Sequence, residues 1–190
     1  MENGRCGGTA FDFPRIQGAV VAGRIFKVGE RVSDQRVGER VLVDPRIRDL
    51  RDPDNLDRAS YLGNATDGGF GQFCKVSSIN AVVIRSNLSP EELATFPCSS
   101  SVAELLLFGS HVSTSETALV TGASEGVGLP LVQLVKRRGA FVIALTSCQK
   151  LERVMILGAD KIEFRDAADL AKAVKDFAPN HDIDVISDIA

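Results

Sequence analysis

The C-terminal half of the chain alternates between short β-rich runs and longer amphipathic stretches. The β-rich runs predict strands at residues 117–121, 141–146, 162–164 and 183–189. The stretches between them predict helices at residues 126–138, 149–157 and 166–177. Gly158 supplies the stop signal for the second of these helices. Strands that alternate with helices in this way are typical of βαβ units and a parallel sheet.

The N-terminal half shows a different pattern, in which β-branched runs are short and glycines interrupt them. Residues 16–26 predict a bent or bulged strand of a barrel, because Gly18 and Gly23 break the run. A turn followed by a strand is predicted over residues 37–43, and two further short strands are predicted at residues 73–76 and 81–84. Residues 44–68 are polar and contain prolines, so they predict a long excursion over the surface.

Two helices are predicted between these halves. Ser89-Pro90-Glu91-Glu92 forms a capping box with proline at the first helical position, which is a complete helix-start signal. A second helix is predicted over residues 99–108 and ends at Gly109. We therefore expect three segments, namely a barrel-like part over residues 1–88, linking helices over 89–112 and an α/β domain over 113–190.

The composition is that of an ordinary soluble globular protein. The chain has 190 residues, of which 44% are hydrophobic and 25% charged, and its net charge is −3. The longest basic run is Lys136-Arg137-Arg138, and the apolar runs are far shorter than a bilayer span. Neither nucleic acid nor a membrane is therefore an expected partner. Four dispersed cysteines, without a CxxC pair, predict a reduced cytosolic compartment and no structural zinc site.

The candidate chemistry lies in a glycine-rich turn between the first predicted strand of the α/β domain and the following helix. The turn has the sequence TGASEGVG, from Thr121 to Gly128. Glycines allow a backbone to approach a pyrophosphate, and the helix N-terminus offers unpaired N–H groups to the anion. The turn predicts a nucleotide site with these cofactor-binding residues: Ser124, Glu125, Gly126 and Val127. The alternative interpretation is a plain tight turn.

The turn matches the TGxxxGxG pattern of the short-chain dehydrogenases, yet the rest of the chain does not. In that family the motif opens the chain, and a Tyr-x-x-x-Lys motif follows downstream. Here the only tyrosine is Tyr61, which precedes the turn. A short-chain dehydrogenase is therefore the less favoured interpretation.

Several stretches resemble landmarks of the medium-chain dehydrogenase/reductase superfamily, whose members join a GroES-like barrel to a later Rossmann domain. These stretches are residues 13–19, 28–30, 37–41, 68–70 and 157–160. The resemblance covers nearly the whole chain. It implies an α/β fold with a partial GroES-like β-barrel, followed by an incomplete Rossmann domain with a doubly wound parallel sheet. It also implies a cytoplasmic, NAD(P)-dependent oxidoreductase similar to alcohol dehydrogenases and quinone reductases.

Zinc ligands are missing from the positions where this superfamily carries them. Zinc-using members have Gly-His-Glu where this chain has Gly18-Ala19-Val20, and a four-cysteine lobe where residues 44–68 contain no cysteine. The resemblance therefore points to the zinc-independent branch, similar to quinone oxidoreductases. It implies hydride transfer from the nicotinamide to a small-molecule quinone or conjugated carbonyl, with no metal to polarise the carbonyl. No catalytic residue is assigned.

The expected cofactor depends on the end of the second predicted strand of the α/β domain. An NAD-selective site places an acid about 20 residues beyond the glycine turn, where it binds the ribose 2′-OH and repels a 2′-phosphate. Ser147 occupies that place, and Lys150 follows it. Lys150, with Arg153 as a second candidate, would meet a 2′-phosphate with positive charge, while Ser147 donates a hydrogen bond. NADP(H) is therefore expected over NAD(H), and a solvated Lys150 at a helix start is the alternative.

Three residues depart from the family pattern. Glu125 stands where a small residue normally lets the pyrophosphate approach, so its carboxylate either repels the phosphate or turns to solvent. Pro130 falls beyond the first turn of the predicted helix, where the lost hydrogen bond can cost about 3 kcal/mol. Val102 stands where a threonine near the nicotinamide is expected.

The resemblance begins partway into the barrel and ends partway through the sheet, so a partial chain is expected. The alternative to an NADPH-dependent reductase is then a truncated, non-catalytic nucleotide-binding remnant of the same family. The family's usual oligomer edge would be missing, so such an oligomer is doubtful. The strand predicted over residues 183–189 is expected to leave an unpaired edge that promotes association.

Overall fold

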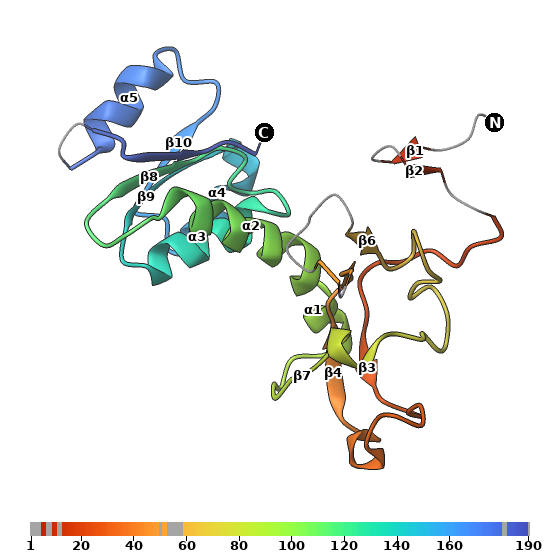
Figure 1. The fold of residues 1–190 in the computed structure, drawn as a ribbon. Coiled ribbons are helices and arrows are strands. Elements are labelled where there is room, and N and C mark those ends of the chain that lie inside the picture. Colours follow the sequence, from red (N-terminus) through yellow and green to blue (C-terminus); the bar gives the residue numbers. More distant parts are fainter. Residues whose placement is uncertain are drawn as a thin grey trace. The chain divides into compact units, whose positions relative to one another are not determined.

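The structure is a computed structural model, and it describes residues 5–6, 9–10, 13–49, 51–52, 59–179 and 182–189. The chain divides into two units, Met1–Cys98 and Ser99–Ala190. Figure 1 shows the small antiparallel strands of the first unit and the parallel sheet of the second. The division falls inside the helix α2 (Phe96–Ser110), within the segment over which linking helices are expected.

A four-stranded sheet lies at the centre of the second unit. Its strands are β8 (Thr117–Val120), β9 (Phe141–Thr146), β10 (Lys161–Phe164) and β11 (Val185–Ser187). All three strand pairs are parallel, and the spatial order is β10-β9-β8-β11. In chain order this is 3-2-1-4, the order of the corresponding strands in a dinucleotide-binding Rossmann sheet. The predicted α/β class is confirmed.

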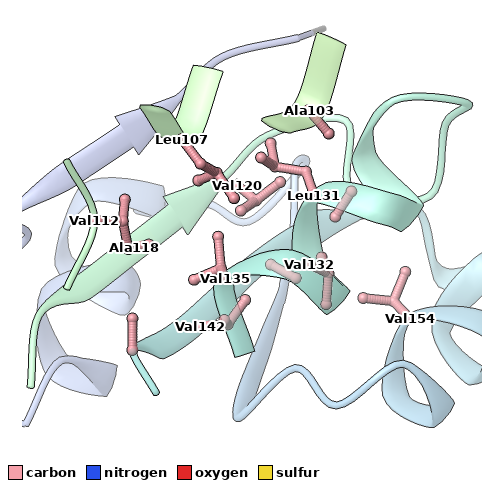
Figure 2. Close-up of a cluster of buried hydrophobic side chains, with 13 residues drawn as sticks. Ala103, Leu107, Val112, Ala118, Val120, Leu131, Val132, Val135, Val142 and Val154 are labelled. Carbon is pink, nitrogen blue, oxygen red and sulfur yellow. The ribbon is translucent and has the colours of Figure 1, made fainter. Parts of the chain in front are cut away.

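Helices cover both faces of this sheet (Figure 1). They are α2, α3 (Gly128–Arg137), α4 (Leu151–Ile156) and α5 (Leu170–Phe177). Figure 2 shows side chains of α2, α3 and α4 converging on β8 and β9 from one side. On the other face, Val174 of α5 packs with Ile143 and Leu145 of β9. A sheet buried on both faces explains why β9 is apolar almost without interruption.

Helix α3 starts later than predicted, and this later start explains how the helix accommodates Pro130. Helix α3 begins at Gly128 rather than at residue 126, so Pro130 lies in its first turn. The first backbone N–H groups of a helix lack intrahelical partners, so a proline there loses little. The flanking bonds from Leu129 N to Glu125 O and from Leu131 N to Val127 O are both made. The cost expected for an interior proline is therefore not incurred.

Capping also decides the start of α5. The helix was expected from residue 166, but it begins at Leu170 because the Asp169 side chain accepts a hydrogen bond from Lys172 N at 3.1 Å. An acidic N-cap satisfies one of the free donors of the first turn. The stop after α4 is as predicted, since Gly158 has a φ of +96°.

The first unit contains short antiparallel strands. Its three-stranded sheet has the order β3 (Ala22–Arg24), β4 (Arg40–Val43) and β7 (Ala81–Val83). Two smaller pairs are β1 (Arg5–Cys6) with β2 (Thr9–Ala10), and β5 (Arg46–Ile47) with β6 (Ser60–Tyr61). Single 3-10 turns cover Asp34–Arg36 and Ser78–Asn80. The helix α1 (Pro90–Ala94) starts at the predicted capping box, in which Ser89 and Glu92 bond each other's backbone.

Two predicted strands of this unit are shorter or absent. Of residues 16–26 only β3 is regular, because the backbone before it bonds a loop instead of a strand. Gly68 N donates to Ile16 O at 2.7 Å, and Gly69 N donates to Gly18 O at 2.8 Å. Gly18 itself has a φ of +103°, which interrupts an extended run. Residues 73–76 form no strand.

None of the helices within the described ranges is both long and apolar enough to cross a membrane.

Candidate functional site

The candidate site lies where the parallel strands of the second unit end. Because the strands are parallel, their carboxyl ends meet at one edge of the sheet. The segments that leave this edge start with Thr121 after β8, Ser147 after β9, Arg165 after β10 and Asp188 after β11. The connectivity reverses between β8 and β11, and in open α/β sheets ligands bind at such a switch point.

Two glycines of the turn after β8 disfavour a side chain, Gly122 because of its backbone conformation and Gly128 because of its close neighbours. Gly122 has a φ of +55°, a conformation that favours glycine. A Cβ on Gly128 would lie 2.2 Å from Gly122 O and 2.7 Å from the Cα of Ala123. Gly128 therefore lets α3 start directly against the end of β8. This is the helix-packing role of the last glycine in a dinucleotide-binding turn.

Gly126 is different, because the fold does not require it to be glycine. A Cβ at this position would have Ser99 Oγ as its nearest neighbour, at 3.6 Å, which is ordinary contact. The residue is exposed and has no positive φ. A bare backbone at this point leaves open space in front of the turn, as the close approach of a phosphate needs.

The backbone N–H groups of the turn fall into two sets, those with an acceptor and those without one in the described residues. Ala123 N donates to Leu145 O at 3.1 Å, and Glu125 N donates to Gly122 O at 2.9 Å. The backbone N–H groups of Ser124, Gly126 and Val127 have no acceptor within the described part of the chain. Together with the N-terminus of α3, they form an arrangement that suits an anion.

An ion pair crosses from the glycine turn to the segment after β9. Lys150 Nζ donates to Glu125 Oε1 at 2.6 Å. The side chains of Lys150 and Glu125 keep 39% and 59% of their surface exposed, so the pair is partly accessible to solvent. The hydrogen bond from Lys150 and then its charge hold the pKa of Glu125 below its usual range, and the charge of Arg165 acts in the same direction.

The structure thus brings together Glu125 of the glycine turn and Lys150 of the segment after β9, two predicted site residues. Ser147 precedes the 3-10 turn Cys148–Lys150, is half-buried, and makes no capping hydrogen bond with its side chain. Ser124 is buried inside the turn, and Val127 caps α3 and packs against the core. Glu125 does not simply turn to solvent, as one predicted outcome had it, because Lys150 binds it.

Three residues at this edge were missed by sequence reasoning. Arg165 follows β10, the neighbour of β9, and its position directly after a predicted strand was the available signal. Thr146 ends β9, and its hydroxyl is buried without a partner among the described residues. Thr121 Oγ1 donates to Asp188 Oδ1 at 2.5 Å and accepts from Ile189 N at 3.1 Å, which joins the ends of β8 and β11.

A metal site was not predicted, and the zinc-free expectation stays a prediction. In the described part of the chain, no three His, Cys, Asp or Glu side chains are grouped so that they could hold a metal ion. Cys74, Cys98 and Cys148 are free thiols.

Known proteins are similar to this chain in both of its units. The family profile of the alcohol dehydrogenase GroES-like domain matches residues 1–86. The acryloyl-coenzyme A reductase of Metallosphaera sedula is 30% identical over 183 residues, which cover 93% of this chain and 53% of that protein. The chain therefore spans about half the length of this curated relative.

Solved structures lead to the same superfamily. The crystal structure of a putative alcohol dehydrogenase from Sinorhizobium meliloti has a TM-score of 0.88 and 40% identity, and the match covers 95% of this chain and 50% of that one. A short chain alcohol dehydrogenase of Escherichia coli CFT073, complexed with the cofactor NADH, has a TM-score of 0.76 and 28% identity, with 86% and 51% covered. With its GroES-like segment followed by a Rossmann-type sheet, the chain belongs to the medium-chain dehydrogenase/reductase superfamily.

Proposed function

We propose that this chain supplies the nucleotide-binding part of an NAD(P)H-dependent reductase that transfers a hydride to a conjugated carbonyl or quinone without zinc. The observation that carries the proposal is the glycine turn from Gly122 to Gly128, placed at the switch point of a 3-2-1-4 parallel sheet. A bound NAD(P)H would supply the hydride.

The residues present fit a dinucleotide. The start of α3 suits its pyrophosphate, and so do the N–H groups of Ser124, Gly126 and Val127, which have no acceptor in the described ranges. Gly126 leaves room for the phosphate to approach the backbone. The Thr146 hydroxyl, which has no partner among the residues that the structure describes, lies at the end of β9, next to the segment that would receive the adenosine ribose. An orphaned buried hydroxyl is rare in proteins unless a ligand or water completes it.

Two observations support the proposed substrate class, namely the name of one relative and the residues that stand in place of zinc ligands. The relative from Metallosphaera sedula is named for acryloyl-coenzyme A, a conjugated carbonyl compound. This chain has Ala19 between Gly18 and Val20, where zinc-using members carry a histidine ligand. A conjugated carbonyl or a quinone accepts a hydride without a Lewis acid more readily than a simple ketone does, so such a substrate suits a zinc-free site.

The proposed cofactor is NADP(H). Ser147 stands where an NAD-selective site has its acid, and the cation Lys150 lies three residues further on. Arg165 adds a second positive charge at the same edge of the sheet. A 2′-phosphate would be attracted by both charges, whereas a ribose 2′-OH gains little from them.

Two measurements on the purified chain test this function. NADPH and NADH are titrated by calorimetry, and NADPH oxidation is followed with a panel of quinones and enoyl thioesters. We expect NADPH binding that is tighter than NADH binding, together with turnover above a no-protein control. Binding without turnover would favour the non-catalytic remnant instead. Failure to bind either nucleotide would contradict the nucleotide site itself.

The zinc-free proposal has a separate test. Elemental analysis of the purified chain is expected to find no stoichiometric zinc, and dialysis against a chelator is expected to leave its melting temperature unchanged. One tightly held zinc per chain would contradict the proposal.

A further inference from the structure

The Glu125–Lys150 ion pair lies beside the end of β9, and in Rossmann sites the residues at the end of this second strand distinguish a 2′-OH from a 2′-phosphate. Lys150 ends the 3-10 turn after β9, and Glu125 reaches it from the glycine turn after β8. In an NAD-selective site the acid that repels a 2′-phosphate comes from the end of the second strand. Here that end carries Ser147, but a carboxylate is present in the same region because another segment supplies it.

We propose that Glu125 competes with the 2′-phosphate of NADP(H) for Lys150, and thereby limits the preference of the site for NADP(H) over NAD(H). The proposal rests on the proposed function, because it concerns the same nucleotide site. It assigns Glu125 a role in specificity and none in hydride transfer.

The charges explain the competition. Glu125 neutralises Lys150 across a 2.6 Å hydrogen bond, so the cation that would attract the phosphate is already bound. A 2′-phosphate carries up to two negative charges and can bind Lys150 only if the carboxylate leaves or shares it. It would also be repelled by the displaced carboxylate. A 2′-OH needs no cation, so NAD(H) binding leaves the pair intact.

The exposure of the pair makes the exchange feasible. Both side chains keep more than a third of their surface in solvent, at 39% for Lys150 and 59% for Glu125. Exposed pairs contribute little to stability, so the pair can open for a ligand at small cost. Glu125 is exposed, like the neighbouring Gly126, and does not belong to the core. Its loss is therefore expected to change ligand preference more than folding.

The test compares two ligands that differ only in the group at issue. Adenosine 2′,5′-bisphosphate and 5′-AMP are titrated into the full chain by calorimetry at fixed ionic strength. The variants are Glu125→Gln, Lys150→Gln and the double variant. Glu30→Gln is the matched control, because it removes the same charge from an exposed glutamate in the other unit. The ratio of the two affinities within each variant corrects for any loss of folded protein.

Glu125→Gln is expected to tighten bisphosphate binding about five-fold, with the affinity for 5′-AMP changed less than about two-fold. Lys150→Gln is expected to weaken bisphosphate binding. In the Lys150→Gln background, Glu125→Gln is expected to have less than half of its effect in the wild-type chain. Glu30→Gln is expected to leave the ratio unchanged.

Three results would overturn the inference. If Glu125→Gln leaves the ratio unchanged while both ligands bind, the carboxylate does not compete, although the nucleotide site stands. An equal gain with and without Lys150 would mean that Glu125 only repels phosphate at a distance. If the wild-type chain binds neither ligand, the proposed function fails, and the inference fails with it.

Discussion

Glu125 and Lys150, 25 residues apart in the sequence, are joined by a hydrogen bond of 2.6 Å between Nζ and Oε1. The bond connects the turn after β8 to the turn after β9. It favours the ionised carboxylate, so the pKa of Glu125 is lowered, first by the hydrogen bond and then by the charge of Lys150. The pKa of Glu125 therefore reports the electrostatic environment at this edge of the sheet.

The first prediction concerns the titration of this carboxyl group. In the Lys150→Met variant the pKa of Glu125 is expected to rise toward its usual range, because the principal stabilising partner is lost. Carboxyl-carbon NMR titration measures the change. A pKa that stays equally low would show that Arg165, and not Lys150, lowers it.

The sign of the pH dependence follows from the lowered pKa. An acid with a lower pKa in the folded state adds stability above its unfolded-state pKa, and that contribution is lost as pH falls through the folded-state pKa. The wild-type chain is therefore expected to be slightly more stable than Lys150→Met at neutral pH. The difference should vanish in acid, as thermal melts at several pH values would show. A difference that grows in acid would contradict this assignment.

The second prediction separates the two kinds of glycine in the turn. Gly128→Ala is expected to destabilise the chain by at least about 2 kcal/mol, because its Cβ would overlap the backbone of Gly122 and Ala123. Gly126→Ala is expected to keep or slightly raise stability, by up to about 1 kcal/mol. It should nevertheless weaken nucleotide binding about ten-fold, since a methyl group would stand in front of the free N–H groups.

Urea unfolding and nucleotide calorimetry check this pair of variants. Each serves as the control for the other, because both add one methyl group to the same turn. If Gly126→Ala binds nucleotide as well as the wild-type chain, the phosphate does not approach the backbone there.

The third prediction concerns Asp160, which directly precedes β10 and bonds the backbone of Val142 near the start of β9. Asp160 Oδ2 accepts from Val142 N at 2.7 Å, and Lys136 Nζ donates to both of its carboxylate oxygens. Asp160→Ala is expected to lower the free energy of unfolding by about 1–2 kcal/mol, because the Val142 N–H loses its acceptor. Part of the Lys136 contribution is screened by solvent.

Two variants make this prediction specific. Asp160→Asn keeps an acceptor for Val142 and is expected to lose less than half as much stability. Asp176→Ala, an exposed aspartate of α5, is expected to change stability by less than about 0.5 kcal/mol. Equal losses from Asp160→Ala and Asp176→Ala in denaturant unfolding would contradict the assigned role.

The fourth prediction concerns the strand β11. Among the described residues β11 pairs with β8 alone, and Ile186 at its centre keeps 64% of its surface exposed. Open apolar edges promote association, and lysine on an edge strand opposes it. Ile186→Lys is expected to reduce self-association of the chain in sedimentation measurements over a range of concentrations. Ile156→Lys, an exposed position on α4, is the control and should have a smaller effect.

The elements of the second unit could be predicted from the sequence because local pattern decides them. The strand expected at residues 141–146 is observed as Phe141–Thr146, since an apolar and β-branched run of this length is typical of a strand buried on both faces. The helix stop at Gly158 also depends on nearby residues alone, and so does the capping box at Ser89 in the first unit. The glycine turn was found for the same reason.

The exact bounds of an element next to a loop were harder to predict from the sequence. The run over residues 16–26 has strand-forming composition, but its first part bonds the loop at Gly68 and Gly69. The choice between a strand partner and a loop partner depends on which backbone lies alongside, and composition carries no information about that. The start of α3 at Gly128 likewise depends on contact with Gly122.

The sequence by itself determined the order of strands and helices and the position of the glycine turn. It also determined that Ser147, and not an acidic residue, stands at the end of β9. Only the tertiary structure decided what surrounds that position. Parallel strands bring the segments after β8, β9 and β10 to one edge of the sheet. Lys150 therefore donates a hydrogen bond to Glu125, and the charge of Arg165 helps to lower the pKa of Glu125. Such interactions depend on the register of strands and the direction of side chains, which are set by packing across the sheet and not by neighbours along the chain.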